Sequence, residues 1–290
     1  MFAGVWTALI TPFKDGKVDY EALGALIDKQ AESGVDGIVP CGSTGESPTL
    51  SYEEHEAVIE FAVKRAKGRM LVLAGTGSNS TDEAIHFTKF AKKIGCDGAL
   101  IMSPYYNKPT QKGLYLHFKA IADTVDIPIM LYNIAGRTAV NIEPATMAKL
   151  AKDCKNIVGV KEASGSLDQM SAIQSLIPNF QIISGDDALT LPLLAIGGTG
   201  IVSVLSNIVP KEVVKLVKLY KSGDFEGAKK QHFKLLPLMK AMFIETNPIP
   251  VKTAAALMGI CKMELRLPMC EMEDSNKAKL EKVLKEYKLI

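Results

Sequence analysis

The chain has 290 residues, of which 47% are hydrophobic and 23% charged, a balance typical of soluble globular proteins and unlike that of disordered or collagen-like chains. The formal net charge is only +2, and no long basic run or basic amphipathic helix is present to follow a phosphate backbone, so we expect no nucleic-acid partner. The five cysteines form no Cys-x-x-Cys pair, which argues against a disulfide framework or a structural zinc site and favours the reducing cytoplasm.

Eight short apolar runs rich in β-branched residues predict β-strands. The first run is followed, not preceded, by the first basic residue, Lys14, so we interpret it as a buried strand rather than a signal peptide. The uncharged run 188–210 contains Pro192 and the GGTG cluster, so a short helix, a turn and a strand explain it better than a membrane span, and no membrane partner is expected. The predicted strands span residues 3–10, 37–40, 70–75, 98–102, 128–133, 156–161, 180–185 and 200–204.

Amphipathic helical patterns lie between these strands, and two of them open with the spacing of a capping box, Ser51 with Glu54 and Ser80 with Glu83. The alternation of continuous apolar strands with helices predicts an α/β protein with a closed (β/α)8 TIM barrel, in preference to an open doubly wound sheet. We assign this barrel to residues 1–223. Residues 224–290 show only helical stretches, interrupted by prolines, and predict a small C-terminal helical domain.

Catalytic groups in such a barrel lie at the carboxyl ends of the strands and in the loops that follow them. Lys161 ends the strand 156–161, and strand alternation places Gly159 on the same face, which leaves space beside the ammonium group. A partly desolvated lysine amine can attack a carbonyl carbon and form a Schiff base. From its position alone, a lysine that simply ends a strand in solvent is an equal alternative.

Other strand ends carry groups that suit a small acidic substrate. Tyr132 ends the adjacent strand, where a phenol can relay a proton, although a core tyrosine is as good an explanation. The loop after the second strand supplies the hydroxyls of Ser43 and Thr44 and backbone amides that can hold a carboxylate, and a similar turn at Gly185 follows the seventh strand. The planar guanidinium of Arg137 can bind a substrate carboxylate. The alternative is that Arg137 is an exposed loop residue without a partner.

Metal and phosphate chemistry find little support in the sequence. The four histidines are scattered, so we expect no metal centre. The GGTG cluster at 197–200 would suit a phosphate or pyridoxal phosphate, but a lone glycine cluster is weak support, and no P-loop is present.

Six phrases occur together in the sequence: TALITPF, GSTGES, SPYYNKP, YNIAGRT, VGVKEASG and SGDD. In this order and spacing the chain, from Val5 to about Pro250, resembles the dihydrodipicolinate synthase family, within the pyruvate-dependent class I aldolase superfamily that includes N-acetylneuraminate lyase. The resemblance implies an aldolase-type lyase that condenses pyruvate with L-aspartate-4-semialdehyde in diaminopimelate and lysine biosynthesis. It also implies that neither a metal nor an organic cofactor takes part.

The resemblance assigns the catalytic roles by position. It makes Lys161 the Schiff-base lysine and Tyr132 the proton-relay phenol. It joins Ser43, Tyr132 and Tyr106 in one relay, with Tyr106 contributed by a neighbouring subunit, so it implies a homo-oligomer, either a dimer or a dimer of dimers. Ser43 stands where a threonine is commoner, and it lacks the methyl group that fixes the rotamer of threonine, so we expect a looser relay geometry.

The resemblance also assigns the substrate contacts. It places Thr44 and the backbone near Gly185 and Val202 in the pyruvate site. It makes Arg137 the clamp for the carboxylate of the aldehyde substrate. Because sugar-acid lyases of the superfamily usually lack that arginine, Arg137 and the SPYYNKP phrase favour the synthase.

Some family members are inhibited by L-lysine at a cleft between subunits. Most of the matching positions here are polar and suit an amino acid, and Glu83 can pair with its ammonium group. Tyr52 replaces a histidine of one subgroup. We therefore hypothesise L-lysine as an effector bound by Ser47, Pro48, Tyr52, His55, Asn79, Glu83 and Tyr105.

Two other functions stay open at this stage. A sibling aldolase acting on a sugar-derived keto acid, of the N-acetylneuraminate or 2-keto-3-deoxygluconate lyase type, would share the lysine and the tyrosine. A barrel that binds a keto acid or amino acid without catalysis would use the same carboxylate-holding loops.

Overall fold

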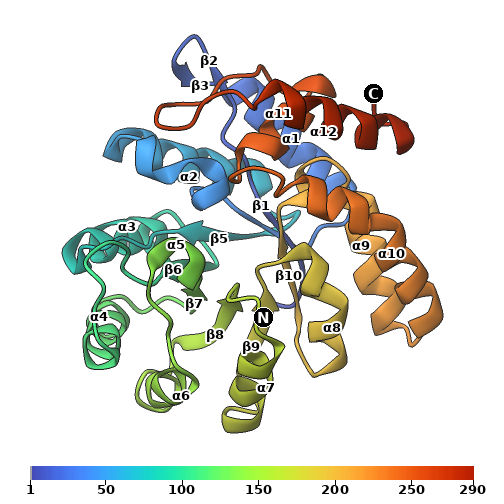
Figure 1. The fold of residues 1–290 in the computed structure, drawn as a ribbon. Coiled ribbons are helices and arrows are strands. Elements are labelled where there is room, and N and C mark those ends of the chain that lie inside the picture. Colours follow the sequence, from blue (N-terminus) through green and yellow to red (C-terminus); the bar gives the residue numbers. More distant parts are fainter. Residues whose placement is uncertain (1) are drawn as a thin grey trace.

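The computed structural model describes residues 2–290, and its eight main strands form one closed barrel (Figure 1). Neighbouring strands are parallel throughout, and β1 pairs with both β4 and β10, which closes the sheet on itself. The predicted (β/α)8 barrel is therefore confirmed. In chain order its strands are β1 (Gly4–Ala8), β4 (Gly37–Val39), β5 (Leu71–Gly75), β6 (Gly98–Met102), β7 (Ile129–Asn133), β8 (Ile157–Glu162), β9 (Gln181–Ser184) and β10 (Gly200–Ser203).

Helices surround the barrel and connect successive strands (Figure 1). The run 188–210 forms α8 (Thr190–Ala195), a turn and β10, as predicted, and no helix within residues 2–290 is long and apolar enough to cross a membrane. A short helix, α5 (Ala135–Thr138), occupies the loop after β7. The longer barrel helices are α1 (Tyr20–Glu32), α2 (Tyr52–Ala66), α3 (Thr81–Lys93), α4 (Gln111–Thr124), α6 (Pro144–Asp153), α7 (Leu167–Leu176), α8 (Thr190–Ala195) and α9 (Pro210–Lys221).

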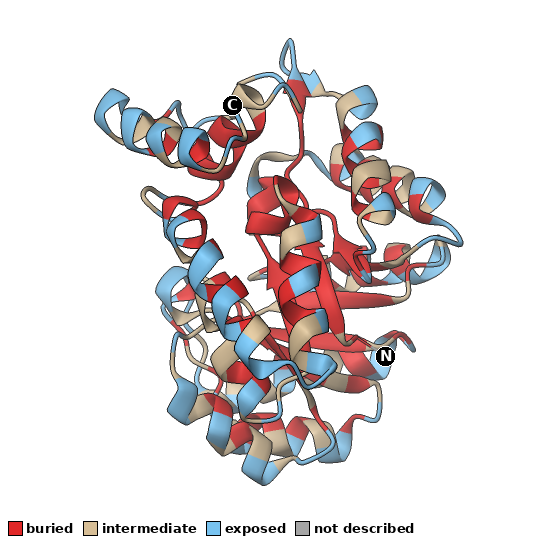
Figure 2. Cartoon of the chain, turned by 90° about the vertical axis from the view of Figure 1, so that its right-hand side faces the viewer, coloured by how far each residue is buried: buried red, intermediate tan, exposed pale blue. Residues whose placement is uncertain are grey.

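Strand residues are buried on both faces, which explains why the strands read as continuous apolar runs. One face fills the barrel interior and the other packs against the helices; Figure 2 shows the buried strands at the centre and exposed positions on the outer faces of the helices. The interior cluster consists of Phe2, Trp6, Ala8, Val39, Leu73, Leu100, Met130, Tyr132, Ile183 and Val202.

Two local features differ from the sequence-based predictions. A small hairpin, β2 (Phe13–Lys14) with β3 (Lys17–Val18), was not predicted, although its Asp-Gly turn is a known hairpin signal. The capping box at Ser51 is complete, whereas the one at Ser80 is only half formed. There the Glu83 carboxylate accepts a hydrogen bond from the Ser78 hydroxyl at 2.7 Å and does not return to the cap.

Three more helices follow the barrel: α10 (Phe225–Ala241), α11 (Ile249–Leu257) and α12 (Asp274–Glu286). We propose that the C-terminal helical domain begins at Asp224. Gly223 has a left-handed backbone with φ of 85° just after α9 ends, and the Asp224 carboxylate accepts the N–H of Gly227 and caps α10. α10 packs along α9, and α12 packs against both α10 and α11.

Candidate active site

Lys161 and Tyr132 lie side by side at the carboxyl end of the barrel, where β7 and β8 pair them directly. The Lys161 side chain is only 7% exposed, and its Nζ lies 4.1 Å from the centroid of the Tyr132 ring. None of the ion pairs within residues 2–290 includes Lys161. A buried amine that no carboxylate engages is well placed to act as a nucleophile.

Space beside Lys161 comes from Gly185 rather than from Gly159. A Cβ atom at Gly185 would lie 3.1 Å from Lys161 Cε and 2.6 Å from the Ala163 Cβ, so only glycine fits there without a shift. A Cβ atom at Gly159 would instead meet the main-chain oxygen of Gln181 at 2.4 Å. The strand register does place Gly159 on the same face as Lys161. The predicted space beside the ammonium group was wrong, because the main chain of β9 fills the place of the missing side chain.

The loop after β4 is held from several sides. Its residues Ser43–Gly45 form a 3₁₀ turn, and the Thr11 hydroxyl donates a hydrogen bond to the Gly45 carbonyl at 2.7 Å. Thr44 is buried, and its Oγ1 accepts a hydrogen bond from Asn247 Nδ2 at 2.9 Å. The two hydroxyl residues predicted from the sequence are thus fixed at the barrel mouth.

A cavity of about 210 Å³ lies beside this loop. Ser43, Arg137 and Tyr105 are among its lining residues, together with Asn247 from the C-terminal segment. The Arg137 Nη2 donates a hydrogen bond to the main-chain oxygen of Asn247 at 2.6 Å, which holds the guanidinium at the cavity. Sequence reasoning missed Asn247, because Pro248 beside it was interpreted, like the other prolines of residues 224–290, only as an interruption between helices.

A buried ion pair ties the same loop to the C-terminal helices. Lys252 Nζ lies 2.6 Å from Glu46 Oε1, and both side chains are almost completely buried. Burial lowers the pKa of Lys252, and the Glu46 carboxylate opposes that shift. The second carboxylate oxygen of Glu46 accepts the main-chain N–H of Arg266 at 3.1 Å, so both oxygens are engaged.

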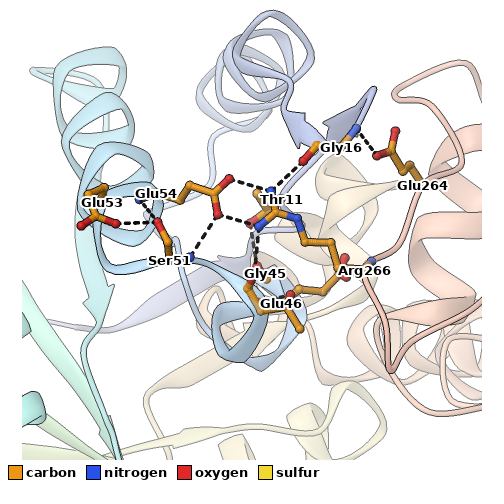
Figure 3. Close-up of polar contacts among 10 residues, drawn as sticks. Thr11, Gly16, Gly45, Glu46, Ser51, Glu53, Glu54, Glu264 and Arg266 are labelled. Atoms are coloured by element: carbon orange, nitrogen blue, oxygen red, sulfur yellow. Dashed lines mark hydrogen bonds and ion pairs between the residues drawn. The ribbon is translucent and has the colours of Figure 1, made fainter.

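Arg266 extends this connection to the outside of the barrel (Figure 3). Its guanidinium forms two bonds of 2.6 Å to the Glu54 carboxylate of α2 and donates to the carbonyls of Thr49 and Gly16. The hydrogen bonds from Arg266 hold the pKa of Glu54 below its usual value. The C-terminal segment therefore holds the loop that carries Ser43 and Thr44 in place through its bonds to Glu46 and Thr49.

Comparison with known proteins gives the family. The model of the "Dihydrodipicolinate synthetase family" matches residues 1–287. The chain belongs to this family. It is 72% identical over 290 residues to the 4-hydroxy-tetrahydrodipicolinate synthase of Endomicrobium trichonymphae, with 100% of each sequence covered. The crystal structure of dihydrodipicolinate synthase from Aquifex aeolicus is 55% identical, covers 99% of each chain and superposes with a TM-score of 0.98.

Two family structures carry small molecules. A chloride-inhibited dihydrodipicolinate synthase from Acinetobacter baumannii, complexed with pyruvate, is 41% identical with a TM-score of 0.97 and covers 100% of both chains. The enzyme from Cyanidioschyzon merolae with lysine bound is 43% identical with a TM-score of 0.96, covering 100% of this chain and 99% of that one.

Most residues that the family resemblance assigned to an effector site lie in one region. Ser47, Pro48 and Tyr105 line the cavity beside Arg137. Burial and the nearby Glu83 carboxylate raise the pKa of Tyr105, and partial desolvation and Glu83 likewise raise the pKa of Tyr52.

The buried His55 stacks on Phe87 with ring centroids 4.2 Å apart and bonds the Gly75 carbonyl through Nε2. The main-chain oxygen of Asn79 accepts a bond from Asn107.

Tyr106 and Val202 occupy contrasting environments. Tyr106 is 90% exposed, with a left-handed φ of 70°, and takes no part in the cavity of its own chain. Val202 is completely buried in the interior cluster that also contains Tyr132.

Across residues 2–290, no three His, Cys, Asp or Glu side chains gather as a metal site would require.

We predict that Lys252→Met lowers the free energy of unfolding by about 3 kcal/mol or more, because it leaves the buried Glu46 carboxylate without its counter-ion. The double variant Lys252→Met/Glu46→Gln should lose less than the single variant, since no unpaired charge remains. Urea unfolding followed by circular dichroism measures both. The matched control is Lys229→Met, which removes an exposed pair with Glu226 and should leave the midpoint unchanged. A double variant less stable than the single one would contradict the prediction.

Proposed function

We propose that this family member catalyses the condensation of pyruvate with L-aspartate-4-semialdehyde, in diaminopimelate and lysine biosynthesis, and that Lys161 forms the Schiff base. The name 4-hydroxy-tetrahydrodipicolinate synthase, borne by a relative 72% identical over the full chain, supports the reaction. The observation that carries the role of Lys161 is its buried amine, which lies above the Tyr132 ring and forms no ion pair within residues 2–290.

The reaction proceeds through an imine in this proposal. The Lys161 amine attacks the C2 carbon of pyruvate, and water leaves. The imine withdraws electrons, so a methyl proton is lost and an enamine forms. The enamine carbon then attacks the aldehyde carbon of the second substrate. Finally, the amino group of that substrate attacks the imine carbon, which closes the ring and releases the lysine.

The remaining residues bind the substrates or move protons in this proposal. Thr44 and the backbone at Gly185 and Val202 hold pyruvate, and the position of Gly185 against Lys161 Cε supports this placement. Tyr132 relays protons to and from the carbinolamine oxygen, together with Ser43 of the same chain and Tyr106 of the partner subunit.

Arg137 binds the carboxylate of L-aspartate-4-semialdehyde in this proposal. Its place in the cavity wall, with Nη2 bonded to the Asn247 carbonyl, supports the assignment. A planar guanidinium can hold a carboxylate with two parallel bonds. Since sugar-acid lyases usually lack this arginine, it favours the synthase over a sibling aldolase.

The surroundings of the cysteines support a cytoplasmic location. All five are free thiols, and Cys41, Cys96 and Cys154 are buried. Free thiols persist where the compartment is reducing. Burial raises the pKa of Cys96 to about 12, so this thiol stays protonated and unreactive.

Borohydride trapping tests the proposed function. We expect pyruvate plus borohydride to add a stable adduct to Lys161, located by peptide mass spectrometry, and Lys161→Ala to lose both the adduct and the consumption of L-aspartate-4-semialdehyde. An adduct on another residue would contradict the assignment. An adduct without consumption of the semialdehyde, but with turnover of a sugar-derived keto acid in a substrate panel, would favour the sibling aldolase. Thermal stabilisation by pyruvate without adduct or turnover would favour the non-catalytic binder.

Mixing two impaired variants tests whether Tyr106 acts across a subunit interface. Its 90% exposure in the single chain supports a role in a neighbouring site and a homo-oligomer. We expect Tyr106→Phe to slow turnover. An equimolar mixture with Lys161→Ala, after dissociation and random reassociation, should recover about a quarter of wild-type activity. About half of the dimers are then mixed, and one of the two sites in each mixed dimer is complete. If the mixture is no more active than the average of its two components, the shared relay is excluded. Circular dichroism of each variant confirms that it is folded.

L-Lysine is the proposed effector. A family member with lysine bound supports it, as does the Glu83 carboxylate, which contributes to the raised pKa of both Tyr52 and Tyr105. We expect millimolar L-lysine to inhibit the wild type, and Glu83→Ala to weaken that inhibition at least about tenfold, because the effector's ammonium loses its partner. The matched control is Glu226→Ala on α10, which should remain as sensitive as the wild type. Activity unchanged by L-lysine would exclude the effector.

A further inference from the structure

Asn247 contacts two proposed substrate-binding residues at once. Its side-chain Nδ2 donates to Thr44 Oγ1 at 2.9 Å, and its main-chain oxygen accepts from Arg137 Nη2 at 2.6 Å. Asn247 is only 6% exposed and lies just before α11, 203 positions along the chain from Thr44. A single residue of the C-terminal segment thus links the two groups proposed to hold the two substrates.

The hydrogen bond between Asn247 and Thr44 has a definite direction. The Nδ2 group of an amide can only donate, so the Thr44 hydroxyl is the acceptor and its single hydrogen stays available to another partner. Within residues 2–290, no hydrogen bond donated by Thr44 Oγ1 is present. A carboxylate only accepts hydrogen bonds. The Thr44 hydroxyl is therefore free to donate its hydrogen to a bound carboxylate.

Among residues 2–290, the side-chain amide of Asn247 forms no hydrogen bond other than the one to Thr44. Its Oδ1 is buried and has no hydrogen-bond partner among residues 2–290, so the bond to Thr44 is the only one that the amide makes there. The segment around it is held in place independently, because Lys252 forms the buried ion pair with Glu46, two residues beyond Thr44. The loop and the C-terminal segment are thus joined at two points, and a change at Asn247 leaves the second intact.

We propose that Asn247 is a positioning residue for pyruvate, whose amide fixes the Thr44 hydroxyl as a hydrogen-bond donor to the pyruvate carboxylate. This inference rests on the proposed function, in which Thr44 binds pyruvate. The contact with Arg137 uses the main-chain oxygen of Asn247, so it survives replacement of the side chain. Substitution of Asn247 therefore affects pyruvate and leaves the semialdehyde site in place.

Steady-state kinetics of Asn247→Leu, which keeps the approximate size of the side chain and removes its donor, test the inference. We expect the KM for pyruvate to rise about tenfold and the KM for L-aspartate-4-semialdehyde to stay within about twofold, the first figure corresponding to one hydrogen bond to a charged group. Asn247→Asp keeps the shape but accepts the hydrogen of Thr44, so it should raise the KM for pyruvate further, and it serves if the leucine variant does not fold. Asn179→Asp, at an exposed position before β9, is the matched control and should behave as wild type.

A double-mutant cycle with Thr44→Val separates positioning from general loss of structure. If Asn247 acts through Thr44, Asn247→Leu adds little to the rise in KM for pyruvate that Thr44→Val already causes. Fully additive effects, or equal increases in KM for both substrates, overturn the inference. Borohydride trapping separates it from the proposed function. An adduct that forms at the same pyruvate concentration in wild type and Asn247→Leu overturns only the inference, whereas no adduct in the wild type overturns both.

Discussion

Closure of the barrel is the constraint on which the other features of this structure depend. The pairing of β1 with both β4 and β10 leaves no free edge in the barrel sheet, and all eight strands run parallel. The carboxyl ends of distant strands therefore meet around one mouth. Lys161 and Tyr132 become neighbours because β7 and β8 pair in register, and Gly185 reaches Lys161 because β9 follows next in the ring.

The mouth is completed by residues that belong to no barrel strand. Asn247, Lys252 and Arg266 all come from the C-terminal helical segment, and each bonds to the loop that carries Ser43 and Thr44 or to its flank. Burial of the Lys252–Glu46 ion pair costs desolvation free energy. Both oxygens of the Glu46 carboxylate nevertheless have partners, the Lys252 ammonium and the main-chain N–H of Arg266. This segment therefore holds the loop that carries Ser43 and Thr44 in place at the carboxyl end of the barrel, where we propose the active site.

Sequence patterns were sufficient for the strands and for part of the site. The eight apolar runs are the eight barrel strands, because burial on both faces removes polar residues from them. The predicted proximity of Lys161 and Tyr132 followed from two adjacent strand ends. The motif phrases led to the correct family, but the individual roles of Ser43, Arg137 and Tyr106 stay predictions. The Gly159 prediction failed because strand alternation says nothing about which neighbouring strand comes closest.

The barrel, the order of its strands and the nucleophile candidate could be predicted from the amino-acid sequence, because periodic burial and strand ends are local properties of the chain. Only the tertiary structure revealed the contacts of Asn247 with Thr44 and of Lys252 with Glu46, which join positions 203 and 206 residues apart. No periodicity or spacing links such distant positions. Their pairing is decided by how the C-terminal helices pack over the closed barrel, where a buried amide or ammonium must find a partner that only the folded chain provides.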